Sequence, residues 1–114
     1  MKTFDNQAAQ GDVLIRRINK LPDGVKKIKP DKQGYVVAHS ETGHHHVIEA
    51  KKGVGVYLGD DPLVSYLTVI DNVETTLEHL RDFDKHEAYT ITGGTYEIRR
   101  QREYTPEGLR RVQD

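Results

Sequence analysis

The chain has 114 residues, no cysteine, a formal net charge of -1, and 35% apolar against 31% charged residues. This length accommodates one domain, residues 1–114, and the absence of cysteine excludes disulfides, thiolate nucleophiles and zinc sites built on cysteine. Apolar residues still alternate regularly along the chain. We therefore interpret the low apolar content as a folded domain with a small core, a polar cavity, or stability gained by homo-oligomerisation.

Charge is segregated along the chain although its total is close to zero. Residues 20–32 carry a net charge of +3, residues 60–87 carry -6, and residues 99–111 carry +3. Such blocks are more typical of solvated faces or complementary subunit surfaces than of a nucleic-acid-binding patch. The sequence contains neither the apolar segment of a signal peptide nor a stretch long enough to span a membrane, so we expect a cytoplasmic protein without a membrane partner.

Short apolar segments rich in β-branched and aromatic residues recur about every ten residues, a pattern that predicts an all-β fold with little helix. We predict about eight strands, at residues 12–18, 35–39, 44–49, 54–58, 63–70, 73–79, 87–92 and 95–104. Short antiparallel strands in one small domain must close into a barrel or pack as two sheets to avoid long exposed edges. The expected architecture is a small barrel or a jelly roll.

Three turn signals separate these segments. Pro22-Asp23-Gly24 predicts a turn that leads into a lysine-rich surface loop. Gly93-Gly94 predicts a two-residue hairpin between the last two strands, because primed turns need a positive φ that glycine adopts without steric cost. Asp71-Asn72 predicts the same kind of hairpin one connection earlier.

Four of the six histidines fall into two clusters. His44 and His46 lie two residues apart in a predicted strand, so their side chains leave the same face. His79 shares its parity with Leu77, on the side of its strand that we assign to the core. His86 precedes the next strand and would reach the same interior only from a loop or across a bulge.

The two histidine clusters would form a metal site if the fold brings them together. Neutral imidazole nitrogens bind Zn, Fe, Mn and Ni, and three protein ligands with an open position are typical of catalytic metal sites. The predicted ligands of such a divalent transition metal are His44, His46, His79 and His86. Glu49 or Glu87 is an alternative fourth ligand. The competing interpretation is a group of histidines that form hydrogen bonds in a polar barrel mouth.

On one face of the predicted strand at 95–104, arginines follow the apolar residues. One parity of this strand holds Tyr96, Ile98, Arg100, Arg102 and Tyr104. Inward arginines beside a polar cavity suit an anionic substrate, which they bind through paired hydrogen bonds. We therefore predict that Tyr96, Arg100 and Arg102 bind substrate and that Tyr104 takes part in catalysis. A salt-bridge network with the acidic segment 60–87, within one chain or between subunits, is the alternative.

Two sets of motifs carry resemblances. Gly43, the pair His44 and His46, and Glu49, followed by His79 or His86, resemble the two motifs of cupins, which implies a small β-barrel with a metal ion held by these histidines. A second set covers nearly the whole chain and resembles a group of small bacterial and phage proteins. Its motifs are Gln10-Gly11-Asp12-Val13, Thr42 to His46, His79, His86, Gly94-Thr95-Tyr96 and Gln101 to Tyr104. This second resemblance implies no particular activity.

Three functions follow from these observations. The first is a cupin-like metal-dependent enzyme that acts on a small anionic or phosphate-containing substrate, with His44, His46, His79, His86 and Tyr104 in the catalytic centre. The second is a metal-independent ribonuclease, in which paired histidines act as general base and acid while arginines hold the RNA phosphate. The third is a phage or assembly component whose acidic and basic faces contact other copies of the chain.

Overall fold

The fold is all-β. The computed structural model describes residues 3–4, 6–38, 45–79, 87–100, 102–105 and 108–111; for Glu87 and the last two ranges it describes the backbone alone. No helix occurs within these ranges. It follows that the described part of the chain holds no helix with the length and apolar character needed to traverse a lipid bilayer.

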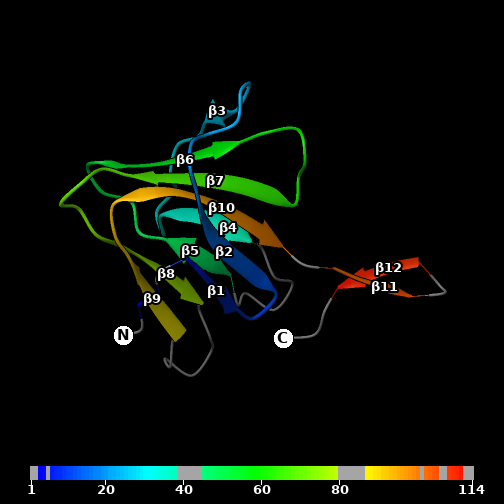
Figure 1. The fold of residues 1–114 in the computed structure, drawn as a ribbon. Helices are drawn as coiled ribbons and strands as arrows, with labels where there is room; N and C mark the ends of the chain where they lie inside the picture. Colours follow the sequence, from blue (N-terminus) through cyan, green and yellow to red (C-terminus); the bar gives the residue numbers. More distant parts are fainter. Residues whose placement is uncertain are drawn as a thin grey trace.

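Most of the strands form two antiparallel sheets (Figure 1). The larger sheet consists of β1 (Gln7–Gln10), β2 (Val13–Ile18), β3 (Lys26–Lys27), β6 (Val54–Leu58), β7 (Val64–Val69) and β10 (Gly94–Arg100), in the order β1-β2-β10-β7-β6-β3. The smaller sheet consists of β4 (Tyr35–Ala38), β5 (His46–Ile48), β8 (Thr75–His79) and β9 (Glu87–Ile91), in the order β4-β5-β8-β9. A separate pair is formed by β11 (Arg102–Thr105) and β12 (Gly108–Arg111).

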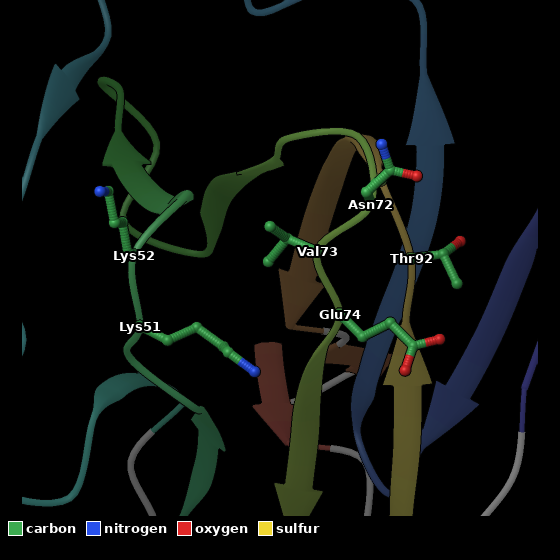
Figure 2. A pocket seen from close by; sticks show the side chains of 7 residues that line it. Lys51, Lys52, Asn72, Val73, Glu74 and Thr92 are labelled. Atoms are coloured by element: carbon green, nitrogen blue, oxygen red, sulfur yellow. The ribbon is translucent and has the colours of Figure 1, made fainter.

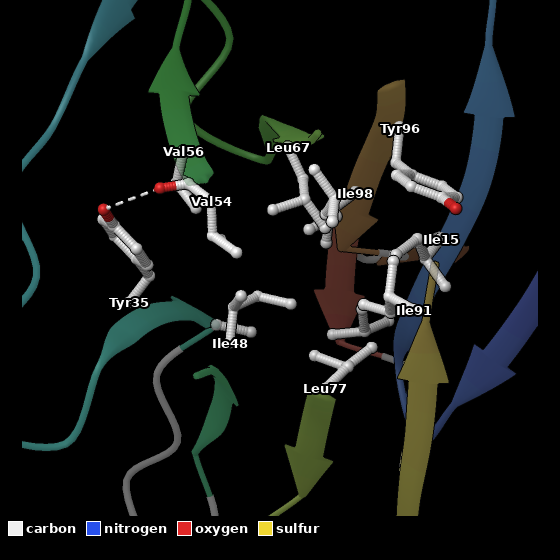
Figure 3. Close-up of a cluster of buried hydrophobic side chains, with 13 residues drawn as sticks. Ile15, Tyr35, Ile48, Val54, Val56, Leu67, Leu77, Ile91, Tyr96 and Ile98 are labelled. Carbon is white, nitrogen blue, oxygen red and sulfur yellow. Dashed lines mark hydrogen bonds between the residues drawn. The ribbon is translucent and has the colours of Figure 1, made fainter. Parts of the chain in front are cut away.

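One apolar core joins the two large sheets. Ile15, Leu67 and Ile98 of the larger sheet are buried together with Ile48 and Leu77 of the smaller one (Figure 3). These residues alternate with more exposed neighbours along most of their strands, as the two-residue period of a strand requires. Fully burying a side chain of this size stabilises a fold by about 1.5–3 kcal/mol, so this shared core is what holds the sheets against each other.

The prediction of an all-β fold with little helix is confirmed, whereas a closed barrel is wrong for the described residues. The six-stranded sheet ends at β1 and β3, and the four-stranded sheet ends at β4 and β9. The chain instead changes sheet several times. Most predicted strands are present within a few residues, and the structure adds β1, the short edge strand β3 and β12.

Two predicted hairpins are also wrong. Asn72 does have a positive φ of 68°, and Gly94 has a φ of 156°. However, β7 and β8 lie in different sheets, and so do β9 and β10. Both turns therefore carry the chain from one sheet to the other. One residue of each predicted turn does have a positive φ, but the connection that it serves is a crossover and not a hairpin.

The predicted strand at 95–104 is two strands. β10 ends at Arg100 after pairing with both β2 and β7, whereas β11 begins at Arg102 and pairs with β12. The parity argument that extended one face from Tyr96 to Tyr104 therefore holds only as far as Arg100. The turn at Pro22-Asp23-Gly24 is confirmed, with a φ of 82° at Gly24, and the lysines that follow it in β3 are exposed.

Candidate functional site

A cluster of polar side chains interrupts the core at one end of the two sheets, where β5 begins and β8 ends. We call it the end cluster; its members are Gln10, Asp12, His46, His79 and Arg100. Gln10, Asp12 and both histidines are buried. Burying ionisable groups costs stability unless they are paired, and perturbed groups of this kind gather at functional sites, so the end cluster is the candidate functional site.

A tight turn brings Asp12 to this end. Gly11 and Asp12 form the two-residue loop between β1 and β2, in which Gln10 pairs with Val13. Gly11 has a φ of 58°, the positive value needed at the first central position of a type II′ hairpin turn. The hairpin thus holds Gln10 at the end of one strand and Asp12 in the turn. Both side chains reach the interior from a segment far from the histidines in sequence.

Gln10 determines which ring nitrogen of His46 carries a hydrogen. The Gln10 amide nitrogen Nε2 donates to the carbonyl oxygen of Leu77 at 3.0 Å, so the amide oxygen Oε1 faces His46 Nδ1, at 2.8 Å. An amide oxygen only accepts hydrogen bonds, and Nδ1 must therefore be the donor. In the neutral imidazole, the lone pair then lies on Nε2. Metal-binding histidines are commonly oriented by a partner of this kind.

The other ring nitrogen of His46 faces Asp12. His46 Nε2 lies 3.4 Å from Asp12 Oδ1, which is long for a hydrogen bond between charged groups. A separation of this size is close to that between two ligand atoms of one tetrahedral ion with bonds of about 2.0–2.1 Å. The donor set of one imidazole and one carboxylate also suits a divalent transition metal. The separation of the pair is compatible with two ligands of one metal ion and also with an ion pair between an imidazolium and the carboxylate.

His79 lies directly beside His46. The two residues are opposite each other in the register of β5 and β8, and their rings are stacked, with centroids 4.0 Å apart and planes inclined by 15°. Lone pairs of an imidazole lie in the ring plane, so two parallel rings do not direct them to one point. In agreement with this geometry, no group of three or more metal-ligating side chains is found among the described residues.

Arg100 completes the end cluster from the larger sheet. Its Nη2 lies 4.0 Å from Asp12 Oδ2, and its side chain is 16% exposed. The parity prediction for Arg100 is consistent with this position, because the side chain follows the buried Tyr96 and Ile98 on the same face of β10. A guanidinium in such a place can hold an anion next to the His46 and Asp12 pair.

The structure separates Tyr96 and Glu49 from this cluster. Tyr96 lies near the start of the same strand, four residues before Arg100. Its ring is buried, its hydroxyl donates to the carbonyl oxygen of Thr92 at 2.7 Å, and Arg17 lies over its ring. Glu49 follows the opposite end of β5 and its side chain is exposed, 3.9 Å from Lys51. The remaining predicted side chains lie outside the described residues. They are His44, His86, Glu87, Arg102 and Tyr104.

Two hollows differ in their relation to the end cluster. A cavity of about 200 Å³ is lined by Arg100 and by Ala38, the register partner of His46, so it adjoins the cluster. A wider hollow of about 530 Å³ lies at the other end of the sheets (Figure 2). Its walls come from Lys51 and Lys52, from the turn that contains Asn72, and from Thr92. Its described lining residues include no histidine, and it is not part of the site.

Residues 9–101 match a family described as a domain of unknown function, DUF8820. The chain belongs to this family. The matched segment contains the end cluster and every histidine, and it ends at Gln101, the first residue of the Gln101 to Tyr104 motif. No cupin family matches the chain. No curated protein and no solved structure matches the chain.

Gln10 and Asp12 are the site residues that the sequence interpretation missed. Glutamine and aspartate are common in turns, and nothing local distinguishes these two as ligands or orienting groups. Two signals were nevertheless present. Both residues lie in the motif Gln10-Gly11-Asp12-Val13, and Gly-Asp between two alternating segments is itself a hairpin signal. A hairpin there would have placed both side chains next to the core.

Proposed function

We propose that this protein is a metal-dependent enzyme that holds a divalent transition metal ion through His46 and Asp12 and acts on a small anionic substrate bound by Arg100. The single observation that carries the proposal is the 3.4 Å separation of His46 Nε2 and Asp12 Oδ1, with His46 Nδ1 held by Gln10. A tetrahedral donor set favours Zn²⁺ over ions that prefer six oxygen ligands. When bound, such an ion would act as a Lewis acid toward a substrate oxygen.

Further ligands would come from the predicted histidines. His79 is adjacent, and it would become a ligand if its ring turned out of the stack with His46. His44 and His86 remain predictions from the sequence, His44 by its two-residue spacing from His46. Three protein ligands with one open position would make the site catalytic rather than structural.

The chain's own residues have distinct tasks in this proposal. Gln10 holds the His46 ring in the tautomer that leaves Nε2 without a hydrogen. Asp12 contributes charge that the cation neutralises. Arg100 orients the substrate by its guanidinium, which is close to Asp12 yet partly exposed. The surrounding core excludes water and thereby strengthens each of these electrostatic interactions.

We also propose that the two sheets form a jelly roll of the cupin-like kind. Support comes from the repeated crossovers between sheets and from the central pairing of β5 with β8, which presents His46 and His79 side by side. A metal held between two such sheets is the arrangement that the cupin resemblance implies. The family match neither contradicts nor supports this relationship, since it is to a domain of unknown function.

The ribonuclease alternative is less well supported. His46 and His79 are each 2% exposed, and general acid–base groups must come within hydrogen-bond reach of the RNA backbone. Their stacking also places the two rings against each other, whereas a general base and a general acid would have to lie on either side of the phosphate. The proposal of an assembly component rests on the segregated charge blocks alone. Metal uptake distinguishes the first function from both alternatives.

The decisive experiment is titration of the metal-free protein with Co²⁺, whose visible absorption reports coordination number, followed by competition with Zn²⁺. We expect one ion per chain with a tetrahedral spectrum, and an affinity at least about 100-fold lower in Asp12→Asn, because loss of a direct ligand should exceed the 10–100-fold effect of losing an outer partner. Asp60→Asn, at an exposed aspartate, is the matched control. Equal binding by the wild type and Asp12→Asn would contradict the site, and so would no binding at all.

A further inference from the structure

The 200 Å³ cavity beside the end cluster has an apolar wall and two polar side chains. The apolar wall includes Val36 of β4, Val56 and Leu58 of β6, and Leu63. The polar groups are Ser65 of β7 and Arg100 of β10. The cavity is smaller than the range of about 300–1,000 Å³ that is typical for drug-sized ligands, so a molecule that fills it has few atoms.

Ser65 provides an independent sign of a ligand. Its side chain is buried, with 5% of the residue exposed, and its hydroxyl has no hydrogen-bond partner among the described residues. An unsatisfied buried hydroxyl costs stability, and a folded protein that retains one commonly uses it. Alanine at this position would fill the same space without that cost. A bound molecule that accepts a hydrogen bond would satisfy the hydroxyl.

Ser65 and Arg100 are placed to contact one ligand together. Ser65 is opposite Ile98 in the register of β7 and β10, and Arg100 lies two residues beyond Ile98 on the same face. Diagonal neighbours of this kind are about 7–8 Å apart, which the long arginine side chain spans. The Arg100 amide is also held by a hydrogen bond to the carbonyl oxygen of Leu63, at 2.8 Å. The polar end of the cavity is therefore fixed by backbone pairing.

We propose that this cavity binds a short-chain aliphatic monocarboxylate. Its carboxylate lies between the Arg100 guanidinium and the Ser65 hydroxyl, and its hydrocarbon chain packs against Val36, Val56 and Leu58. This inference rests on the proposed function, because it names the substrate class of that site. A guanidinium fork matches a carboxylate in geometry. One arginine and one hydroxyl offer too few donors for a phosphate dianion, and the apolar wall would leave its other oxygens unpaired.

The metal site and the cavity are coupled through Asp12. In the metal-free protein, Asp12 lies 4.0 Å from Arg100 and partly neutralises it. A cation bound by Asp12 would take over this carboxylate and leave Arg100 more attractive to an anion. Coupling between two ligands is reciprocal, so the carboxylate should raise metal affinity by the same factor. We expect a factor of about 5–150, the usual range for coupled sites.

Hexanoate is the probe that tests this proposal, with hexanol as the uncharged control, in amide NMR titrations of the full chain with and without Zn²⁺. We expect hexanoate, and not hexanol, to shift the amides of residues 36–38, 56–58, 63–65 and 98–100, with a Kd of about millimolar or below. Arg100→Gln should weaken binding about 10–100-fold, because it removes a charge-assisted hydrogen bond. Arg99→Gln is the matched control, since Arg99 lies on the other face of β10 beside Glu97.

Ser65→Ala separates ligand binding from folding. We expect weaker hexanoate binding by a factor of about 3–10 together with an unchanged or higher Tm, because the variant removes an unsatisfied hydroxyl. Equal binding of hexanol and hexanoate, or equal hexanoate binding by Arg100→Gln and Arg99→Gln, would overturn the proposal. Hexanoate binding without any Zn²⁺ uptake would refute the metal site and support the cavity assignment. Zn²⁺ uptake without hexanoate binding would refute only the cavity assignment.

Discussion

The imidazole rings of His46 and His79 are stacked at a centroid separation of 4.0 Å in the interior of the protein. They come from residues 33 positions apart in sequence that are direct register partners at one end of the two central strands of the four-stranded sheet. Two polar rings buried in this position need polar side chains around them. Gln10 and Asp12 contact His46 from the hairpin of the other sheet, and Arg100 lies 4.0 Å from Asp12.

Gln10 should control metal affinity without contacting the ion. We expect Gln10→Ala to lower the affinity for Co²⁺ or Zn²⁺ about 10–100-fold, because the His46 ring loses the partner that sets its tautomer and orientation. Gln7→Ala changes the same residue type at the exposed start of the same strand and should leave affinity unchanged. Metal titration of the three proteins measures this. Identical affinities for both variants would show that the Gln10 contact has no orienting role.

Tyr96 should matter for stability and not for ligands. Tyr96→Phe removes the hydroxyl that donates to Thr92 and should lower the free energy of unfolding by about 0.5–1.5 kcal/mol, the usual contribution of one hydrogen bond. Metal and hexanoate affinity should stay the same, because Tyr96 lies at the opposite end of β10 from Arg100. Urea denaturation and the two titrations check both parts. A change in hexanoate affinity would restore Tyr96 as a substrate-binding residue.

The shared core should be sensitive to truncation on the smaller sheet. Ile48→Ala is expected to lower the free energy of unfolding by about 2–5 kcal/mol, because it leaves a cavity between the sheets. Ile70→Ala deletes the same atoms at a side chain that is 57% exposed and should have a much smaller effect. Chemical denaturation of both variants gives the comparison. Similar losses at the two positions would mean that the sheets do not share one core.

The crossover at Asn72 should tolerate glycine and reject a branched side chain. Asn72 has a φ of 68°, in the left-handed region, where a β-branched residue is strongly disfavoured. We expect Asn72→Val to lower the free energy of unfolding by about 1–2 kcal/mol, whereas Asn72→Gly should be neutral or slightly stabilising. Thermal unfolding of both variants tests this expectation. Equal stability of the two would contradict the left-handed backbone at this turn.

The alternation of inward and outward side chains along single strands could be predicted from the sequence. The inward faces of His46, His79 and Arg100 follow from the two-residue period of a strand, which depends on nothing beyond the strand itself. It also places Tyr96 on the inward face, where it is buried, but a shared face does not imply a shared end of the strand, and Tyr96 lies away from the end cluster. The same reasoning failed beyond Arg100, where the chain leaves β10 and starts a different pair of strands.

The sequence by itself determined the all-β class, most of the strands, their inward faces, and the turns that need a positive φ, because each is a property of a few consecutive residues. Only the tertiary structure decided which strands pair, that the turns at Asn72 and Gly94 are crossovers, and that Gln10 and Asp12 meet His46. Those outcomes depend on how two apolar faces bury each other across large sequence separations. The local sequence of a turn, or around a polar side chain, is the same whichever distant residues the folded sheets place beside it.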